Sequence, residues 1–357
     1  MSKIPFDPKE LTVVKKSFDF FGNEIPNYAY PITPKEAWHK LYNKEGVWLP
    51  TDIESGVFCP NVIPDNKARG FVIEKNMIDP ATFGGPDMFG IQWVYVPVVG
   101  GSMEDPNIPH LMEDVNDWED LIKFPDVDSW DWKGSAEANK EFLDNGIANM
   151  FWFLNGMGFE RLVSFMGFEQ AAVALIDEEQ EEALHALLSK LTDLHIHMVD
   201  LACDAYGDGI DGFTVHDDWG SQRSPFFSVD VGEEIFVPYM KKLTDHIKSR
   251  GKVADLHSCG HIEAQIENII AGGWQSWTPM PMNDTKKLYD EYGDKIIIGV
   301  VDEGYPEGAS DEEIAKHAEE FAARYYAPGK PSTLSLYSTV VKTDKYREAL
   351  YKASRML

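Results

Sequence analysis

The sequence is poor in cysteine and lacks long apolar runs. Its 357 residues include three cysteines, Cys59, Cys203 and Cys259, which do not suffice for the disulfide framework of a small secreted protein. The longest aliphatic stretches, such as residues 296–301, are far shorter than the ~18 residues that cross a bilayer. The first ten residues contain no apolar segment of a secretory signal. We therefore expect a soluble, cytoplasmic protein in a reducing environment, with no membrane partner.

Basic residues are also scarce. The chain has 32 Lys and Arg against 60 Asp and Glu, a net charge of −28. Such a chain repels phosphate backbones, so we expect no nucleic-acid partner. With 43% hydrophobic and 12% aromatic residues, the composition is that of an ordinary folded protein and excludes a disordered or fibrous chain.

From about residue 145 onward, short apolar runs alternate with amphipathic stretches that end at glycines. Strands are expected at residues 150–154, 213–215, 253–256, 274–277, 296–301 and 333–336. Helices are expected at 178–206, 231–250, 262–271, 284–292, 310–325 and from 344 to the end of the chain. This alternation is typical of right-handed βαβ units and a parallel sheet. It predicts an α/β protein with a single (β/α)8 TIM barrel; a doubly wound sheet is the alternative.

The N-terminal part of the chain is less regular and rich in proline, glycine and aromatic residues. We expect residues 1–80 to be an N-terminal extension with loops packed on the barrel. Residues 81–357 would form the barrel, and the chain would be one domain overall.

Two adjacent carboxylates follow the predicted strand at 213–215. Loops after the strands of a barrel line its active site, and neighbouring carboxylates are costly unless a cation, a proton or a substrate donor offsets them. Asp217 and Asp218 are therefore catalytic candidates. Trp219 and Gln222 would add a flat apolar face and an amide for an organic substrate. Helix capping with solvation is the alternative.

A histidine and a cysteine follow the predicted strand at 253–256. Side chains two residues apart on an extended segment point to the same side. Imidazole and thiolate are ligands that zinc takes, so His257 and Cys259 are candidate zinc ligands. The alternative is a buried thiol beside a hydrogen-bonded histidine.

The same segment, residues 255–260, also fits Asp-x-His-x-x-Gly, a pattern by which some cobalamin domains coordinate cobalt. That interpretation requires a downstream Ser-x-Leu and a later Gly-Gly. The Ser-x-Leu at 332–334 lies far along the chain and no Gly-Gly follows it, which disfavours cobalt coordination here.

Further polar residues follow the last two predicted strands. Glu303, or its neighbour Asp302, would supply an oxygen ligand or a general acid or base, with a helix cap as the alternative. Tyr337, within residues 335–338, would place a hydroxyl beside the substrate.

The order of these segments resembles the uroporphyrinogen decarboxylase superfamily, and more narrowly its branch of corrinoid-dependent methyltransferases. The resemblance lies in HDDWGSQRSPFF, then VADLHSCGHIEAQIENIIAGGWQSW, then PMNDTKKLYDEYGDKIIIGVVDEG. MFGIQWVYVPVVGGSMEDP and FPDVDSWDW upstream also fit that branch, so the resemblance covers roughly residues 85–357. It implies a (β/α)8 barrel.

The resemblance implies zinc on His257 and Cys259, because LHSCG matches the His-x-Cys ligand pair of these methyltransferases. Relatives often supply another cysteine near the last strand, where this chain has residues 335–338 and no cysteine after Cys259. Glu303, Asp302 and Asp218 are the candidates for a further ligand. The arginine-bearing N-terminal signature of the decarboxylases has no counterpart here.

The activity implied is demethylation of a small methylated substrate, with an aryl methyl ether as the favoured one in an O-demethylase system. The methyl group would pass to cobalt(I) of a separate corrinoid protein. Asp217 or Asp218 would position or protonate the substrate oxygen. Trp219, Trp93 and Phe153 would sandwich a flat ring. A homodimer is one expectation for the assembly.

Two alternatives belong to other functional classes. One is a metal-free decarboxylase that works through Asp217 or Asp218. The other is a non-enzymatic carrier of a corrinoid or tetrapyrrole in the barrel mouth.

Overall fold

The chain folds into two compact units in the computed structural model. The model describes residues 5–18, 24–51, 53–98, 100–327 and 329–355. The first unit comprises residues 1–56, 146–148 and 275–357, and the second comprises 57–145 and 149–274. Each unit has its own strands and helices.

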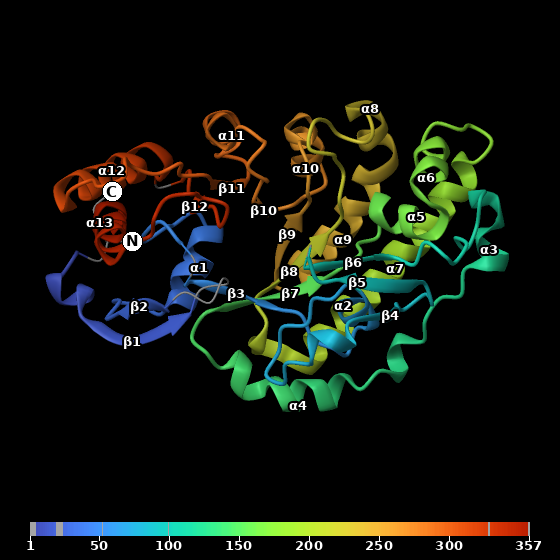
Figure 1. The fold of residues 1–357 in the computed structure, drawn as a ribbon, viewed down its shortest axis with the longest axis horizontal. Helices are drawn as coiled ribbons and strands as arrows, with labels where there is room; N and C mark the ends of the chain where they lie inside the picture. Colours follow the sequence, from blue (N-terminus) through green and yellow to red (C-terminus); the bar gives the residue numbers. More distant parts are fainter. Residues whose placement is uncertain (1–4, 19–23, 52, 99, 328, 356–357) are drawn as a thin grey trace. The chain divides into compact units, whose positions relative to one another are not determined.

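Three adjacent parallel strands form the centre of the second unit: β7 (Ala148–Phe153), β8 (Gly212–His216) and β9 (Val253–His257). Between β7 and β8 come α5 (Phe159–Met166), α6 (Phe168–Ala174) and α7 (Glu181–Tyr206). Between β8 and β9 come α8 (Val229–Val231), a π-helical turn (Gly232–Phe236) and α9 (Val237–Ser249), and α10 (Ile266–Ala271) follows β9. Figure 1 shows the three strands side by side.

Alternation along these strands separates an apolar face from a polar one. On the apolar face Phe153 stacks on Phe213 with ring centroids 5.5 Å apart, and both side chains are almost fully buried. Residues one position away point to the opposite face. There His216 and His257 are paired across β8 and β9. The polar residues of this face therefore come together at the carboxyl ends of the strands.

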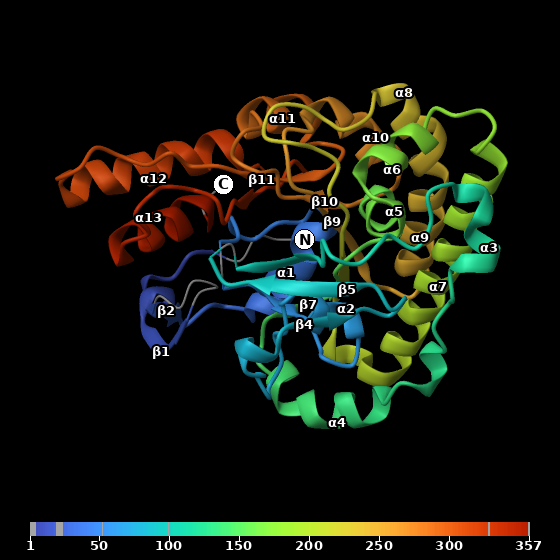
Figure 2. The same cartoon turned by 45° about the vertical axis from the view of Figure 1, so that its right-hand side comes forward.

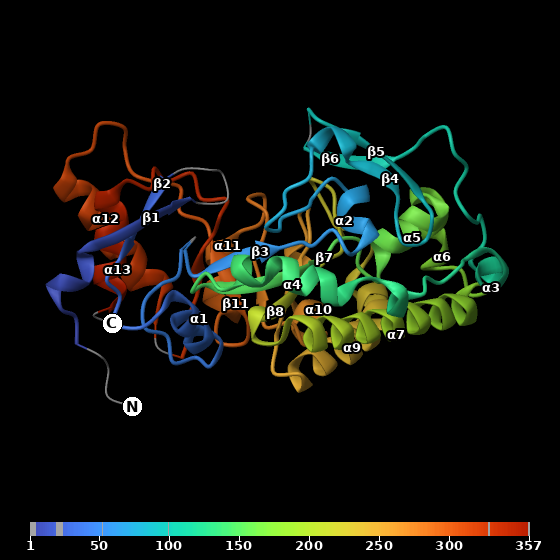
Figure 3. The same ribbon diagram turned by 90° about the horizontal axis from the view of Figure 1, so that it is seen from below.

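An antiparallel sheet covers the polar face of the second unit. It consists of β4 (Gly84–Pro86), β5 (Gln92–Val96) and β6 (Gly101–Glu104). Figure 3 shows this sheet and α2 (Pro64–Ala68) on the side of β7 and β8 that is opposite α7 and α9. Two further helices of this unit are α3 (Trp118–Leu121) and α4 (Trp132–Leu143). In this covering layer, Arg69 follows α2 and its guanidinium lies over the ring of Trp93 on β5.

The first unit contains the remaining strand–helix repeats. Its parallel strands are β10 (Ser276–Trp277), β11 (Ile297–Val300) and β12 (Thr333–Leu334). Its helices are α1 (Pro34–Tyr42), α11 (Thr285–Tyr292), α12 (Asp311–Tyr325) and α13 (Asp344–Arg355). β1 (Val13–Phe18) and β2 (Glu24–Tyr28) form an antiparallel pair. Figure 2 shows α12 and α13 side by side.

The alternation of strands and helices is that of a (β/α)8 barrel, so the predicted fold class is confirmed. Seven strands belong to this alternation in the described part of the chain, including β3 (Ser55–Phe58). The predicted helix at 178–206 is observed at 181–206, and the one at 310–325 at 311–325. The grouping into one domain with an extension at 1–80 stays a prediction. Among the described residues, every helix is too short or too polar to cross a bilayer.

Candidate metal centre

Four side chains with metal-binding atoms converge at the carboxyl ends of β8 and β9. They are His216, Asp218, His257 and Cys259, and their ligand atoms all lie within 4.8 Å of one another. The two imidazole rings stack with centroids 4.8 Å apart and an interplanar angle of 20°. Two imidazoles, a thiol and a carboxylate are a donor set that zinc accepts, so the residues present fit the ion that the sequence predicts.

The donor atoms are held by short contacts within the group. Asp218 Oδ1 accepts a hydrogen bond from the backbone N–H of Cys259 at 2.7 Å and lies 3.7 Å from His216 Nε2. Cys259 Sγ lies 3.5 Å from His257 Nε2. The carboxylate thus bridges the segment after β8 to the segment after β9, and the thiol side chain is half-buried beside it.

Glycines allow the two segments to approach closely. Gly260 has a φ of +97°, and a Cβ there would lie 2.3 Å from the carbonyl carbon of Gly220. Hydrogen bonds join the same segments: Trp219 N–H donates to the Ser258 side chain (Oγ) at 3.1 Å, and His261 N–H donates to the Ser221 backbone carbonyl at 2.8 Å. A side chain at position 260 would therefore separate the donor pairs.

The histidines experience opposite electrostatic environments. Burial disfavours a charge on His216, but the carboxylates of Glu160 and Asp218 outweigh it and raise the pKa of His216 well above its usual value. Burial, together with the nearby positive charge on His216, lowers the pKa of His257 to about 3. Burial raises the pKa of the Cys259 thiol. His257 is thus a neutral imidazole at physiological pH.

Asp217 points away from this group. Its Oδ1 accepts the Glu160 N–H at 2.8 Å, and its Oδ2 accepts the Trp219 indole N–H at 3.0 Å. A Cβ at Gly158 would lie 2.0 Å from Oδ2, so the approach to the start of α5 requires glycine. Burial raises the pKa of Asp217 to about 7. The catalytic role predicted for Asp217 stays a prediction.

The predicted substrate-binding side chains of the second unit are spread over several places. Trp219 is 1% exposed and packs on Phe227, and Gln222 is exposed. Trp93, on β5, is buried beneath the guanidinium of Arg69, which lies 4.7 Å from the ring centroid. Phe153 packs on the helix side of β7. Of these four, Trp219 and Trp93 are hydrogen-bonded to the surroundings of the metal-binding group, Trp219 through Asp217 and Ser258 and Trp93 through Asp87.

Glu303 and Tyr337 belong to the first unit. The Glu303 carboxylate is 76% exposed and pairs with Lys286 at 2.6 Å. Tyr337 donates its backbone N–H to Ser335 Oγ at 3.2 Å. Asp302, the neighbour of Glu303, is buried and accepts hydrogen bonds from Tyr346 Oη at 2.6 Å and from His317 Nε2 at 2.8 Å. The roles predicted for these residues stay predictions.

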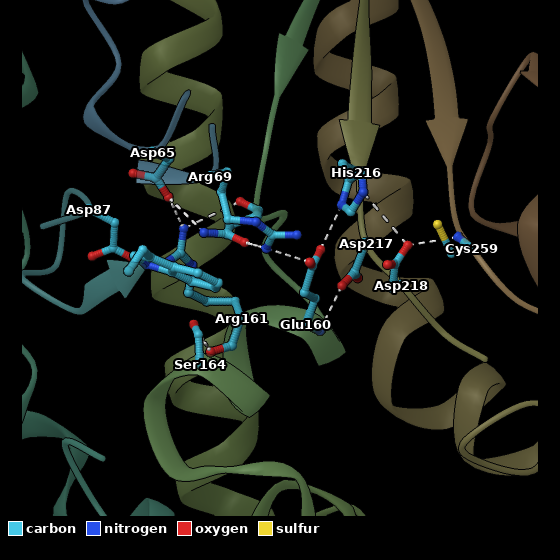
Figure 4. Close-up of polar contacts among 12 residues, drawn as sticks. Asp65, Arg69, Asp87, Glu160, Arg161, Ser164, His216, Asp217, Asp218 and Cys259 are labelled. Atoms are coloured by element: carbon cyan, nitrogen blue, oxygen red, sulfur yellow. Dashed lines mark hydrogen bonds and ion pairs between the residues drawn. The ribbon is translucent and has the colours of Figure 1, made fainter. Parts of the chain in front are cut away.

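Sequence reasoning did not single out His216, Glu160, Arg69 or Trp152. Glu160 Oε2 accepts a hydrogen bond from His216 Nδ1 at 2.7 Å, and Glu160 Oε1 accepts one from Arg69 at 2.6 Å (Figure 4). The Trp152 ring lies 5.4 Å from the His257 ring, and Phe71 lies 5.7 Å from Trp152. For His216 a signal existed, since it directly precedes the two carboxylates at the end of a strand.

The fold and these strand-end residues define a barrel protein with a candidate metal centre. The family model for uroporphyrinogen decarboxylase (URO-D) matches residues 157–336, about half of the chain and a span that contains all four donors. The chain therefore belongs to the uroporphyrinogen decarboxylase family, in agreement with the resemblance that the sequence predicts.

Solved structures match this chain at low sequence identity. A methyltransferase from Methanosarcina mazei is 14% identical, with 90% of this chain and 83% of that chain covered and a TM-score of 0.53. Dispersin B is 11% identical, with 89% and 92% covered and a TM-score of 0.30. A cycloalternan-degrading enzyme from Trueperella pyogenes is 14% identical, with 90% and 44% covered and a TM-score of 0.32. The last two scores are too low to support an inference. No curated protein sequence matches the chain.

Proposed function

We propose that this protein is a zinc-dependent methyltransferase. It removes the methyl group from a small substrate, favoured to be an aryl methyl ether, and transfers it to cobalt(I) of a separate corrinoid protein. The observation that carries the proposal is the convergence of His216, Asp218, His257 and Cys259 within 4.8 Å. The family and the structural likeness to the Methanosarcina methyltransferase support the same reaction class.

Four of the chain's own side chains would hold the ion. His216, His257, Cys259 and Asp218 replace the ligand set that ends in a later cysteine, which this chain lacks. Zinc bound there would act as a Lewis acid toward the substrate heteroatom from which the methyl group departs. Asp218 is held in place by the Cys259 N–H.

An aromatic wall supports a flat substrate. Trp152 lies beside His257 and contacts Phe71, and both aromatic side chains are half-buried. Aromatic rings attract other rings in offset or edge-to-face arrangements. A methoxyarene stacked on Trp152 would bring its ether oxygen toward the donor group, so Trp152 takes the role that the sequence suggests for Phe153.

The test uses chemically reduced cob(I)alamin as the methyl acceptor and the full chain purified without chelators. We expect the cob(I)alamin absorbance to disappear when a methoxyarene is added, and we expect a phenol to form in equal amount. A His257→Ala variant should be inactive. The surface variant Asp204→Asn, on α7 away from the donor group, serves as the control and should be as active as the wild type.

The proposal is overturned if no methoxyarene, methylamine, methylthiol or methanol methylates cobalt, either with cob(I)alamin or with reduced corrinoid proteins.

A metal-free decarboxylase is the second candidate. It is favoured by the family's own reaction and by a buried carboxyl, Asp217, whose pKa is raised to about 7. Release of carbon dioxide by metal-depleted protein, abolished in Asp217→Asn, would support it. Dependence of the activity on zinc would exclude it.

A further inference from the structure

Glu160 connects the candidate metal centre to a guanidinium. One carboxylate oxygen accepts from His216 Nδ1 at 2.7 Å, and the other accepts from Arg69 at 2.6 Å. The Glu160 side chain is 12% exposed, so both contacts are largely shielded from water. Its backbone N–H donates to Asp217 Oδ1. Glu160 is therefore fixed at both ends of the residue.

Arg69 is itself held by a buried network. It donates to the Asn155 side-chain oxygen and lies over the Trp93 ring. Asn155 is fully buried, has a φ of +57° and donates to Asp65 at 3.3 Å. Arg161 pairs with Asp65 and Asp87 behind it. Figure 4 shows these contacts leading from Asp87 to Cys259 through one line of polar side chains.

This arrangement decides which nitrogen of His216 is available to a metal. In the neutral ring that a metal ligand requires, a carboxylate that accepts from Nδ1 fixes the N–H on Nδ1 and leaves the lone pair on Nε2. Nε2 is the nitrogen that faces Asp218, 3.7 Å away. A rotated ring would lose the bond to Glu160, so ring orientation and tautomer are set together.

We propose that Glu160 is a positioning residue of the metal centre, which presents His216 as an Nε2 ligand, and that Arg69 holds Glu160 in place for that task. This inference rests on the metal centre of the proposed function and is independent of whether methyl transfer occurs. Outer carboxylates of this kind strengthen metal binding by orienting the ligand ring and raising its basicity.

The chain contains a matched control. On α7 and α9, Asp200 accepts from His246 Nε2 at 2.9 Å and from Arg250. This is the same Arg–carboxylate–His combination, but His246 is outside the metal-binding group found among the described residues. Asp200→Ala therefore removes equivalent contacts at a place where no effect on metal binding is expected.

The experiment measures zinc affinity by competition with a chromophoric chelator at fixed pH. We expect Glu160→Ala and Arg69→Met to lower the affinity about 10- to 100-fold. Glu160→Gln keeps an acceptor oxygen, so its zinc affinity should fall less than that of Glu160→Ala. Arg69→Lys should keep most of the wild-type zinc affinity. Asp200→Ala should leave the affinity unchanged. The visible spectrum of the cobalt(II)-substituted protein should change in Glu160→Ala, because the His216 ligand is displaced.

Unchanged zinc affinity and cobalt spectrum in folded Glu160→Ala would overturn the proposal, as would absence of zinc binding by the wild type. If Glu160→Ala does not fold, Glu160→Gln and Arg69→Met decide by the same two measurements. The two proposals can fail separately. If the wild type binds zinc, the variants lose zinc affinity as expected and no methyl group is transferred, the proposed function is contradicted and this inference stands.

Discussion

The second unit contains two triads, each of an arginine, a carboxylate and a histidine, in different surroundings. Arg69, Glu160 and His216 lie beneath the covering sheet, with side chains 11% to 16% exposed. Arg250, Asp200 and His246 lie on the outer helices, with side chains 27% to 34% exposed. In both triads the carboxylate contacts the histidine and the arginine, but Glu160 binds His216 through Nδ1 and Asp200 binds His246 through Nε2. The difference lies in burial and in what the other ring nitrogen of the histidine faces.

The comparison teaches that a histidine–carboxylate pair is not by itself a functional signature. His216 Nε2 faces three further metal-binding side chains, and its contacts are shielded from solvent, where charges interact more strongly. The outer triad is more accessible to water and salt, which weaken its ion pairs, so it is expected to contribute about 0–1 kcal/mol. Function is expected where the second nitrogen has converging donors.

The largest effect is expected from removing a donor. Cys259→Ser replaces a thiolate ligand with a hydroxyl, and we expect zinc content to fall from about one ion per chain to near zero. The control is Cys203→Ser, because Cys203 is buried on α7 outside the donor group. Elemental analysis of both proteins checks this prediction. If Cys259→Ser held as much zinc as the wild type, Cys259 would not be a zinc ligand, and the converging donors would no longer distinguish the triad of His216 from that of His246.

Breaking the buried network behind Arg69 should be the next largest effect. Arg161 is fully buried between Asp65 and Asp87, and its removal leaves two buried carboxylates without a counter-charge. We expect Arg161→Met to lower the free energy of unfolding by about 3–5 kcal/mol. Arg250→Met in the exposed triad should cost about 0–1 kcal/mol. Urea unfolding measures both, and similar losses would contradict the role assigned to burial.

His195 provides a separate test of how burial changes the charge of a histidine. Burial lowers the pKa of His195, on α7, to about 4. Between the usual pKa of about 6.5 and this value, the imidazole of His195 binds a proton more readily in the unfolded chain than in the folded one. The free energy of unfolding should therefore fall by about 3 kcal/mol as pH falls from about 6.5 to about 4. The difference in unfolding free energy between wild type and His195→Gln should shrink by this amount between pH 7 and pH 4. A constant difference would show that folding does not lower the pKa of His195.

The smallest effect is expected at the aromatic wall. Trp152→Leu removes the ring beside His257 and should raise KM for a methoxyarene about 3- to 10-fold, with little change in stability. Phe153→Leu, on the opposite face of β7, should lower stability and leave KM unchanged. Steady-state kinetics and thermal unfolding of both variants separate the two faces. An increase in KM confined to Phe153→Leu would reverse this assignment.

The fold was predictable because its signals are local. Apolar runs and glycine-terminated amphipathic stretches mark strands and helices independently of their partners. The pairing of His257 with Cys259 follows from the same locality, because residues two apart on an extended segment share a side. The two donors that lie on one segment, His257 and Cys259, could therefore be predicted from the sequence.

The rest of the site depends on contacts between distant segments. His216 joins the donor group because the register of β8 and β9 places it beside His257. Glu160 and Arg69 reach His216 from α5 and from the end of α2, which no spacing rule connects. The sequence predicts Phe153 as a ring beside the substrate, whereas Trp152 lies beside His257. The two residues are adjacent on β7, and a shift of one residue along a strand exchanges the polar face for the apolar one.

The contact between Gly220 and Gly260 has a thermodynamic consequence. Because backbone hydrogen bonds join the two segments, we expect the four donors to be preorganised without the ion, unlike those of a zinc finger, whose folding and metal binding are one event. Metal would then stabilise the chain by mass action alone, in proportion to the logarithm of the free ion concentration. Zinc removal should leave a folded protein that reloads without refolding.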